Sequence, residues 1–295
     1  MTNKQVLLPK KELESAYELF SNGQIMEAIS QIKVLNEKFP KQPLLFNLIG
    51  ACYKEIGQLE GAAKMFGIAV SLRPNYAEAH FNLGVVFQDL DQKNESIESY
   101  KKAIAITPNF PDAHNNLGNV YIALDQYEAG IGSFEWAIAH QHDFAEAYNN
   151  LAKAYNNLGN EKDAIINFEK AIHYNPNYDK AYFNLALVFK DLGDEKGFLK
   201  NIEKALALKP DWGYAYYHLS RIKKFTKNDP QIDEMKSILN RDDLPINERI
   251  GFSFALSKAF EDLKNNKEQF KFLNDANSLH KKELGYSIKK DQDLF

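Results

Sequence analysis

The chain has a single cysteine, Cys52, among its 295 residues, so no disulfide can form within it. A reducing cytoplasm fits this count, although an exported protein poor in cysteine would look the same. No stretch approaches 18 consecutive apolar residues, and the N-terminal segment lacks the apolar core of a signal peptide. We therefore expect a cytoplasmic protein with no membrane span.

An excess of basic charge and the common catalytic motifs are also missing. The net charge is −4 and the pI is about 6.0, which argues against a general nucleic-acid binder. There is no Walker loop, no G-x-G-x-x-G, no H-E-x-x-H and no C-x-x-C. His140 and His142 have no third ligand nearby in the sequence, and Cys52 falls among packing residues. We expect no catalytic residue, no metal and no cofactor, and therefore no enzyme activity in this chain.

The sequence does contain a short motif that recurs every 34 residues. A fixed period of this length indicates a stacked-repeat protein, in which each unit packs only against its neighbours. The clearest copies are EAHFNLG at 78–84, DAHNNLG at 112–118, EAYNNLA at 146–152 and KAYFNLA at 180–186.

Six successive units share one pattern of packing residues, counted from the first residue of each unit. Position 8 is small throughout and position 20 is small in five units, which lets two antiparallel helices approach closely. Position 24 is aromatic or branched, position 27 is alanine in five units, and position 32 is a helix-stopping proline in five. Position 15 is glycine or aspartate, which suits a left-handed turn between helices. The units span 9–42, 43–76, 77–110, 111–144, 145–178 and 179–212.

These columns, at this period, resemble the tetratricopeptide repeat family over residues 9–212. The resemblance implies an all-α fold, a right-handed superhelical solenoid of antiparallel helix pairs. It also implies that the first helix of each pair lines a concave face. Two departures predict local changes: Phe198 replaces a small residue at position 20, so we expect the sixth pair to be splayed or repacked. His142 replaces the proline, so we expect the helix before it to run on.

The repeat becomes irregular after residue 212. We expect a degenerate seventh helix pair over 213–249 and a cryptic eighth pair over 250–285. Residues 1–8 and 286–295 are expected to be terminal tails. The register of the eighth pair rests on Leu256, Ser257, Phe260, Leu273 and Ala276, which occupy positions 7, 8, 11, 24 and 27.

The last 65 or so residues carry a second resemblance. They look like the connecting region of bacterial proteins in which tetratricopeptide repeats precede a sulfotransferase domain. The resemblance implies that this chain is the repeat arm, and that a catalytic domain would begin soon after Phe295. Its residues are Glu248, Arg249, Phe254, Ala255, Leu256, Lys258, Ala259, Glu261, Asp262, Leu263, Phe270, Leu273 and Asn277.

Four asparagines share position 6 of consecutive units: Asn82, Asn116, Asn150 and Asn184. Asparagine is a mediocre helix former, so four in one register require a reason. Each amide offers a donor and an acceptor, which match the C=O and N–H of an extended peptide. We therefore predict a peptide-binding asparagine ladder, as in the tetratricopeptide arm of a protein glycosyltransferase that these columns resemble. The alternative is that asparagine is common at this position and supports neighbouring helices.

Helical spacing adds further candidates to the same inward surface. Positions 5, 9 and 12 contribute amides, lysines and aromatic rings to it, and the ones we assign to peptide binding are Phe81, Asn115, Asn119, Asn149, Lys153, Phe183 and Lys190. A carboxylate clamp of the chaperone-binding kind is disfavoured, because the cations at two of its five positions are absent.

The sequence thus predicts a scaffold that binds a protein or peptide in a concave groove, as the recruiting arm of a sulfotransferase-type protein. Nucleic acid and membrane are not expected partners. The alternative is a stand-alone assembly scaffold that forms homo-oligomers or organises a complex, with no link to sulfotransfer.

Overall fold

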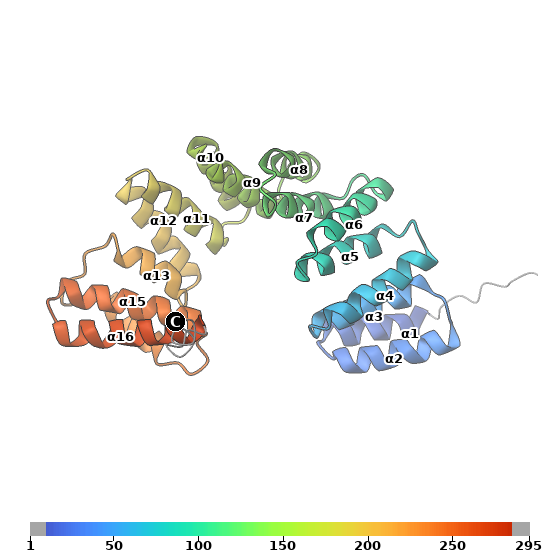
Figure 1. Cartoon of the computed structure of the whole chain (residues 1–295), viewed down its shortest axis with the longest axis horizontal. Coiled ribbons are helices and arrows are strands. Elements are labelled where there is room, and N and C mark those ends of the chain that lie inside the picture. Colours follow the sequence, from blue (N-terminus) through green and yellow to red (C-terminus); the bar gives the residue numbers. More distant parts are fainter. Residues whose placement is uncertain (1–9, 285–295) are drawn as a thin grey trace, which may run out of the picture. The chain divides into compact units, whose positions relative to one another are not determined.

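The computed structural model describes residues 10–284, and this range contains sixteen α-helices and no strand. The expected tails at 1–8 and 286–295 lie outside the described residues. The helices are α1 Lys10–Ser21, α2 Ile25–Lys38, α3 Pro43–Glu55, α4 Leu59–Leu72, α5 Ala77–Asp89, α6 Lys93–Ile106, α7 Pro111–Ile122, α8 Tyr127–His140, α9 Ala145–Asn157, α10 Glu161–Tyr174, α11 Asp179–Asp191, α12 Glu195–Leu208, α13 Gly213–Ser220, α14 Pro230–Leu239, α15 Ile246–Asp262 and α16 Asn266–Glu283. The predicted all-α class, a solenoid of stacked helix pairs, is confirmed (Figure 1).

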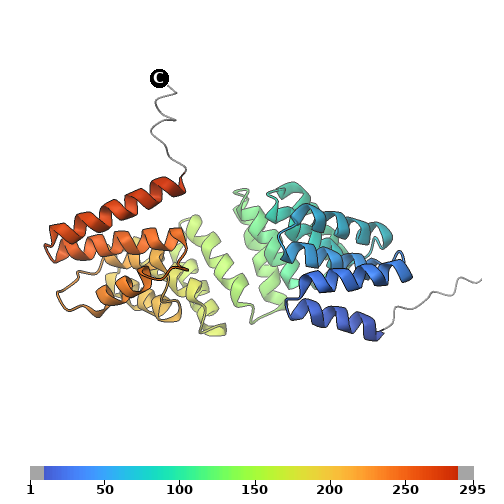
Figure 2. The same cartoon turned by 90° about the horizontal axis from the view of Figure 1, so that it is seen from below.

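The chain divides into two compact units, and the division falls between Ala154 and Tyr155, inside α9. Within the first unit the pairs α1–α2, α3–α4, α5–α6 and α7–α8 pack as hairpins, each against the next. Within the second unit α11 packs on α12, and α15 packs along α16; both pairs are visible in Figures 1 and 2. Each unit has its own buried core, as expected for a repeat protein.

The turns inside the pairs have the left-handed backbone that the sequence predicts at position 15. Four of these residues are glycines, with φ between 72° and 75°, and two are Asp91 and Asp125, with φ of 57° and 56°. Lys264 has a φ of 57° and occupies the same position of the eighth pair. The cryptic pair therefore has the same kind of turn, made by a residue less suited to it.

Close contact between the helices of a pair also follows the predicted columns. A Cβ atom added to Gly84 would lie 2.5 Å from the Tyr100 ring, and one added to Gly118 would lie 2.6 Å from the Phe134 ring. Tyr100 and Phe134 are completely buried. The ring at position 24 thus packs directly on the backbone of position 8.

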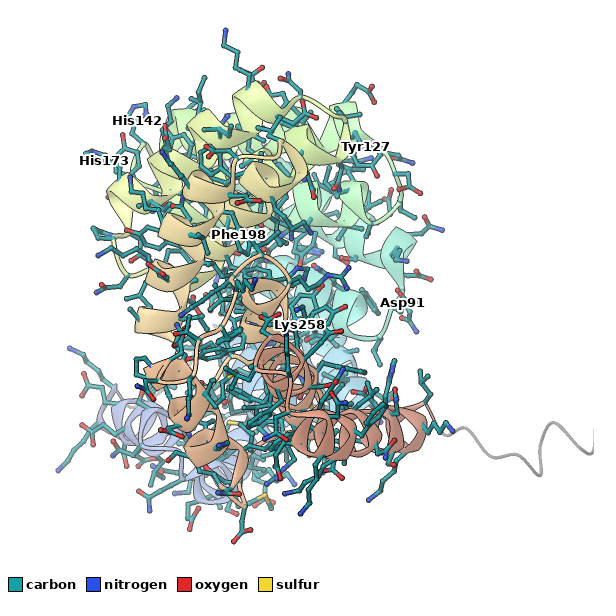
Figure 3. The ribbon with its side chains drawn as sticks, turned by 90° about the vertical axis from the view of Figure 1, so that its left-hand side faces the viewer. Asp91, Tyr127, His142, His173, Phe198 and Lys258 are labelled. Atoms are coloured by element: carbon teal, nitrogen blue, oxygen red, sulfur yellow. The ribbon has the colours of Figure 1, made fainter. Side chains whose placement is uncertain are left out.

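One of the two local expectations needs correction. α8 ends at His140 and is 14 residues long, as α6 is. The replacement of proline by His142 therefore does not lengthen the helix. The carbonyl of Ala137 accepts the Gln141 N–H, as the matching residues do after the other second helices. The other expectation, that the sixth pair is splayed or repacked, is not contradicted: Phe198, labelled in Figure 3, is completely buried in the core that includes Ile202.

The C-terminal helices depart from the repeat. α13 has only 8 residues, and α15 has 17 and begins at Ile246, before the expected start of the eighth pair. α13 packs closely on α15 because two glycines meet there: a Cβ on Gly251 would lie 2.3 Å from the carbonyl carbon of Gly213.

Candidate functional site

The asparagines of the first unit form hydrogen bonds between consecutive repeats. Asn82 Nδ2 donates to Asn47 Oδ1 at 3.1 Å, and Asn47 Nδ2 donates to the Glu78 carboxylate at 3.2 Å. Asn47 is buried, Asn82 is half-buried and Glu78 is exposed. α3 is therefore joined to α5 through three polar side chains at positions 5, 2 and 6.

The same arrangement occurs two repeats later. Asn150 Nδ2 donates to Asn115 Oδ1 at 3.0 Å, and Asn115 Nδ2 donates to the Glu146 carboxylate at 3.3 Å. Asn149 Nδ2 donates to Asn150 Oδ1 at 3.4 Å. Asn115, Asn149 and Asn150 are all buried. These contacts support neighbouring helices. The sequence left this role open as the alternative to peptide binding for the asparagines at position 6.

Other residues of the predicted binding site, at positions 6 and 9, are more exposed to solvent. Asn82 is half-buried, and its Oδ1 accepts no hydrogen bond from the described protein. Asn116 is half-buried and hydrogen-bonds the Tyr100 hydroxyl; burial raises the pKa of Tyr100, and this hydrogen bond offsets part of the increase. Asn119 is half-buried and Lys153 is exposed. These four residues are the accessible polar part of the predicted site in the first unit.

The aromatic candidates are less open than the sequence suggests. Phe183, in the second unit, is 5% exposed and packs on Trp212 with ring centroids 4.5 Å apart. It belongs to the core and does not form an exposed aromatic patch. Phe81, in the first unit, is half-buried against Phe110, with ring centroids 4.9 Å apart.

The remaining predicted residues lie on α11. Asn184 and Lys190 are half-buried there, and Lys190 Nζ lies 3.6 Å from the Asp191 carboxylate. Whether these side chains, or any others of the predicted set, bind a peptide stays a prediction.

A pocket that the sequence did not assign lies at the C-terminal end of the second unit. It has a volume of about 430 Å³ and is lined by residues of α13, α15 and α16 together with Arg221. Tyr217 and Arg221 hold positions 5 and 9 of the seventh unit, and Phe254 and Lys258 hold the same positions of the eighth. Extending the inward columns beyond residue 212 would have found all four.

Two half-buried histidines and the buried cysteine have pKa values shifted by their surroundings. Burial, followed by repulsion from His140, lowers the pKa of His114 to about 4. Burial, followed by the charges of Lys190 and Arg221, lowers the pKa of His218 to about 4. Burial raises the pKa of Cys52 to about 11, which disfavours the nucleophilic thiolate.

The described residues offer neither a metal site nor a membrane span. Between residues 10 and 284, no group of three or more histidine, cysteine, aspartate or glutamate side chains could hold a metal ion. In the same range, every helix is too short or too polar to cross a bilayer.

Family models match the repeats directly. A model described as "TPR repeat" matches residues 50–91 and 89–125, and one described as "Tetratricopeptide repeat" matches 145–178 and 179–211. No curated protein matched the chain.

Many solved structures share the fold. The crystal structure of MamA is 28% identical, with a TM-score of 0.51 over 55% of this chain and 95% of MamA. YrrB, described as a TPR protein with an unusual peptide-binding site, is 19% identical, with a TM-score of 0.51 over 63% and 96% of the two chains. A tetratricopeptide repeat protein from Parabacteroides merdae is 17% identical, with a TM-score of 0.64 over 84% and 98%. The sequence columns, the helical hairpins and these matches together identify residues 50–125 and 145–211 as tetratricopeptide repeats.

Proposed function

We propose that this chain is a scaffold that binds an extended polypeptide on the surface formed by the first helices of its repeats. The observation that carries the proposal is the fixed placement of amides in the first unit. Asn82 is oriented by its bond to Asn47, and its Oδ1 remains available to accept a peptide N–H. A side chain held in place before binding loses less conformational entropy when the partner arrives.

The accessible residues can recognise the main chain of a partner. Asn82, Asn116 and Asn119 lie on α5 and α7 and supply amide donors and acceptors, and Lys153 adds an exposed cation on α9. Backbone groups are the same in every sequence, so we expect this surface to bind peptides of many different sequences.

Fluorescence anisotropy with a labelled twelve-residue Ser-Ala peptide tests the proposal. Each of Asn116→Ala and Asn119→Ala should weaken binding about fivefold, since one net hydrogen bond contributes about 1 kcal/mol. Asn94→Ala is the matched control, because Asn94 is an exposed amide on the second helix α6. A peptide N-methylated along its backbone should also bind more weakly. Equal affinity of the wild type for the methylated and unmethylated peptides would exclude recognition of the main chain.

The link to sulfotransferases stays a prediction from the sequence. Several residues behind it make structural contacts: Glu248 Oε2 accepts the Tyr214 N–H at 3.3 Å, and Arg249 donates to the carbonyls of Leu239 and Leu244, each at 3.0 Å. We expect no sulfonate transfer by these 295 residues alone, and an assay with a sulfonate donor checks this.

Homo-oligomer formation is the alternative role. Light scattering over a dilution series distinguishes the two, because a monomeric binder keeps one mass at all concentrations whereas a reversible assembly loses mass on dilution.

A further inference from the structure

The pocket of the second unit borders the point where α13 stops. α13 ends at Ser220 after 8 residues, whereas α11 continues for 13. The chain then turns away from the helix axis, and the Phe225 N–H donates to the Asp262 carboxylate at 3.1 Å. The turn is further held by an ion pair of 2.7 Å between Lys223 and Asp229. Arg221, the first residue after α13, lines the pocket of about 430 Å³ beside this turn.

Part of the pocket wall is aromatic and aliphatic, and the rest is polar or charged. The rings of Tyr217 and Phe254 have centroids 5.9 Å apart and are inclined by 60°, and Leu273 of α16 also lines the pocket. All three side chains are half-buried, so part of each remains open to a ligand. The volume falls within the range of sites that enclose a ligand, and these walls suit an aromatic or branched apolar side chain.

The positive charges at the pocket differ in how they are neutralised. Lys258, labelled in Figure 3, lies 3.1 Å from the Glu261 carboxylate and also pairs with Asp262. Arg221 instead donates from Nη1 to the Tyr217 hydroxyl at 3.0 Å, and no carboxylate of the described protein lies within ion-pair distance of it. Arg221 is exposed and is the unmatched cation of this site.

An aromatic row leads into the pocket along α13. Tyr214 is 51% exposed and stacks near Tyr217, with ring centroids 6.4 Å apart. Such a row offers contact area beyond the pocket itself, so it fits a chain with several residues better than an isolated small molecule. Tyrosine and arginine are also the residues that most often dominate binding energy at protein interfaces.

We propose that this pocket, formed by Tyr217, Arg221, Phe254, Lys258, Glu261 and Leu273, takes an aromatic side chain of an acidic peptide segment, with Arg221 pairing the peptide's carboxylate. The inference rests on the proposed function, because it assigns a preferred partner to a scaffold that otherwise recognises main chain. It places the selectivity of the protein at α13–α16.

Amide NMR of the full chain tests the proposal with three blocked pentapeptides: Gly-Asp-Phe-Asp-Gly, Gly-Asp-Ala-Asp-Gly and Gly-Lys-Phe-Lys-Gly. The first should shift resonances of α13, α15 and α16, and should bind at least tenfold more tightly than the other two. Arg221→Gln should remove the preference for aspartate over lysine while the preference for phenylalanine over alanine remains. Lys224→Gln, a neighbouring exposed cation that does not line the pocket, should change neither.

Equal affinity for the three peptides, no binding of the first, or shifts confined to α5 and α7 would each overturn the pocket assignment. The last pattern would leave the proposed main-chain recognition intact, since Asn82 and Asn116 lie on those two helices. If the wild type failed to bind the Ser-Ala peptide but still preferred Gly-Asp-Phe-Asp-Gly, the proposed function alone would be overturned.

Discussion

At the scale of single residues, the buried asparagines are the most sensitive positions. Asn115 is 1% exposed, accepts from Asn150 and donates to Glu146. Asn115→Ala would leave the buried Asn150 amide without its acceptor, and an unsatisfied buried donor costs about 1–3 kcal/mol. We expect a lower free energy of unfolding by that amount, measured by urea denaturation.

Asn119→Ala is the matched control for this prediction. Asn119 lies one turn further along the same helix and is half-buried. Its substitution should weaken peptide binding and leave stability within about 0.5 kcal/mol of the wild type. Equal destabilisation by both variants would mean that the hydrogen bond between Asn115 and Asn150 makes no specific contribution to the free energy of unfolding.

Two helical glycines give opposite predictions for the same substitution. In Gly118→Ala the new methyl would meet the Phe134 ring at 2.6 Å, whereas in Gly132→Ala it would meet nothing within 4 Å. We expect the first to lower stability by about 1–2 kcal/mol through overpacking, and the second to raise it by about 0.5–1 kcal/mol. Thermal unfolding of both variants checks the signs, and a stabilising Gly118→Ala would show that the hairpin opens freely.

At the scale of elements, the turn of the eighth pair carries avoidable strain. Lys264 has a φ of 57°, where the equivalent residues are glycine or aspartate. Lys264→Gly should stabilise the chain by about 1 kcal/mol, because glycine has no Cβ to clash in the left-handed region. Lys267→Gly, in the first turn of α16, should instead lower stability, because glycine is a poorer helix former than lysine. Chemical denaturation compares the two, and a loss of stability in Lys264→Gly would contradict the argument.

The sequence predicted the helix pairs and their turns because these depend on local columns that repeat. It did not predict that Asn82 and Asn150 would bond to position 5 of the preceding repeat, since that contact needs asparagine at both positions. The short α13 was also missed. The turn after it is held by Asp262, 37 residues after Phe225, and the start of α13 packs on α15 where Gly213 meets Gly251. A period of 34 shows neither contact.

At the scale of the whole molecule, the half-buried histidines His114 and His218 make stability depend on pH. His114 belongs to the first unit and His218 to the second, and burial is the main cause that lowers the pKa of each to about 4. An unfolded histidine takes up a proton near pH 6.5, so between about pH 6.5 and 4 the unfolded chain binds more protons. Stability is therefore full above pH 6.5 and decreases as the pH falls toward 4.

Replacing His114 by tyrosine tests this pH dependence. Tyrosine holds the same position in the next two repeats, as Tyr148 and Tyr182, so the site should accept the ring. His114→Tyr should retain about 1–2 kcal/mol of the stability that the wild type loses between pH 7 and pH 4.5, because one protonation step is removed. Urea denaturation of both proteins at pH 8 gives the reference, since neither histidine is protonated there in either state. Parallel loss of stability in the two proteins would show that carboxylates, and not the imidazole of His114, control the acid sensitivity.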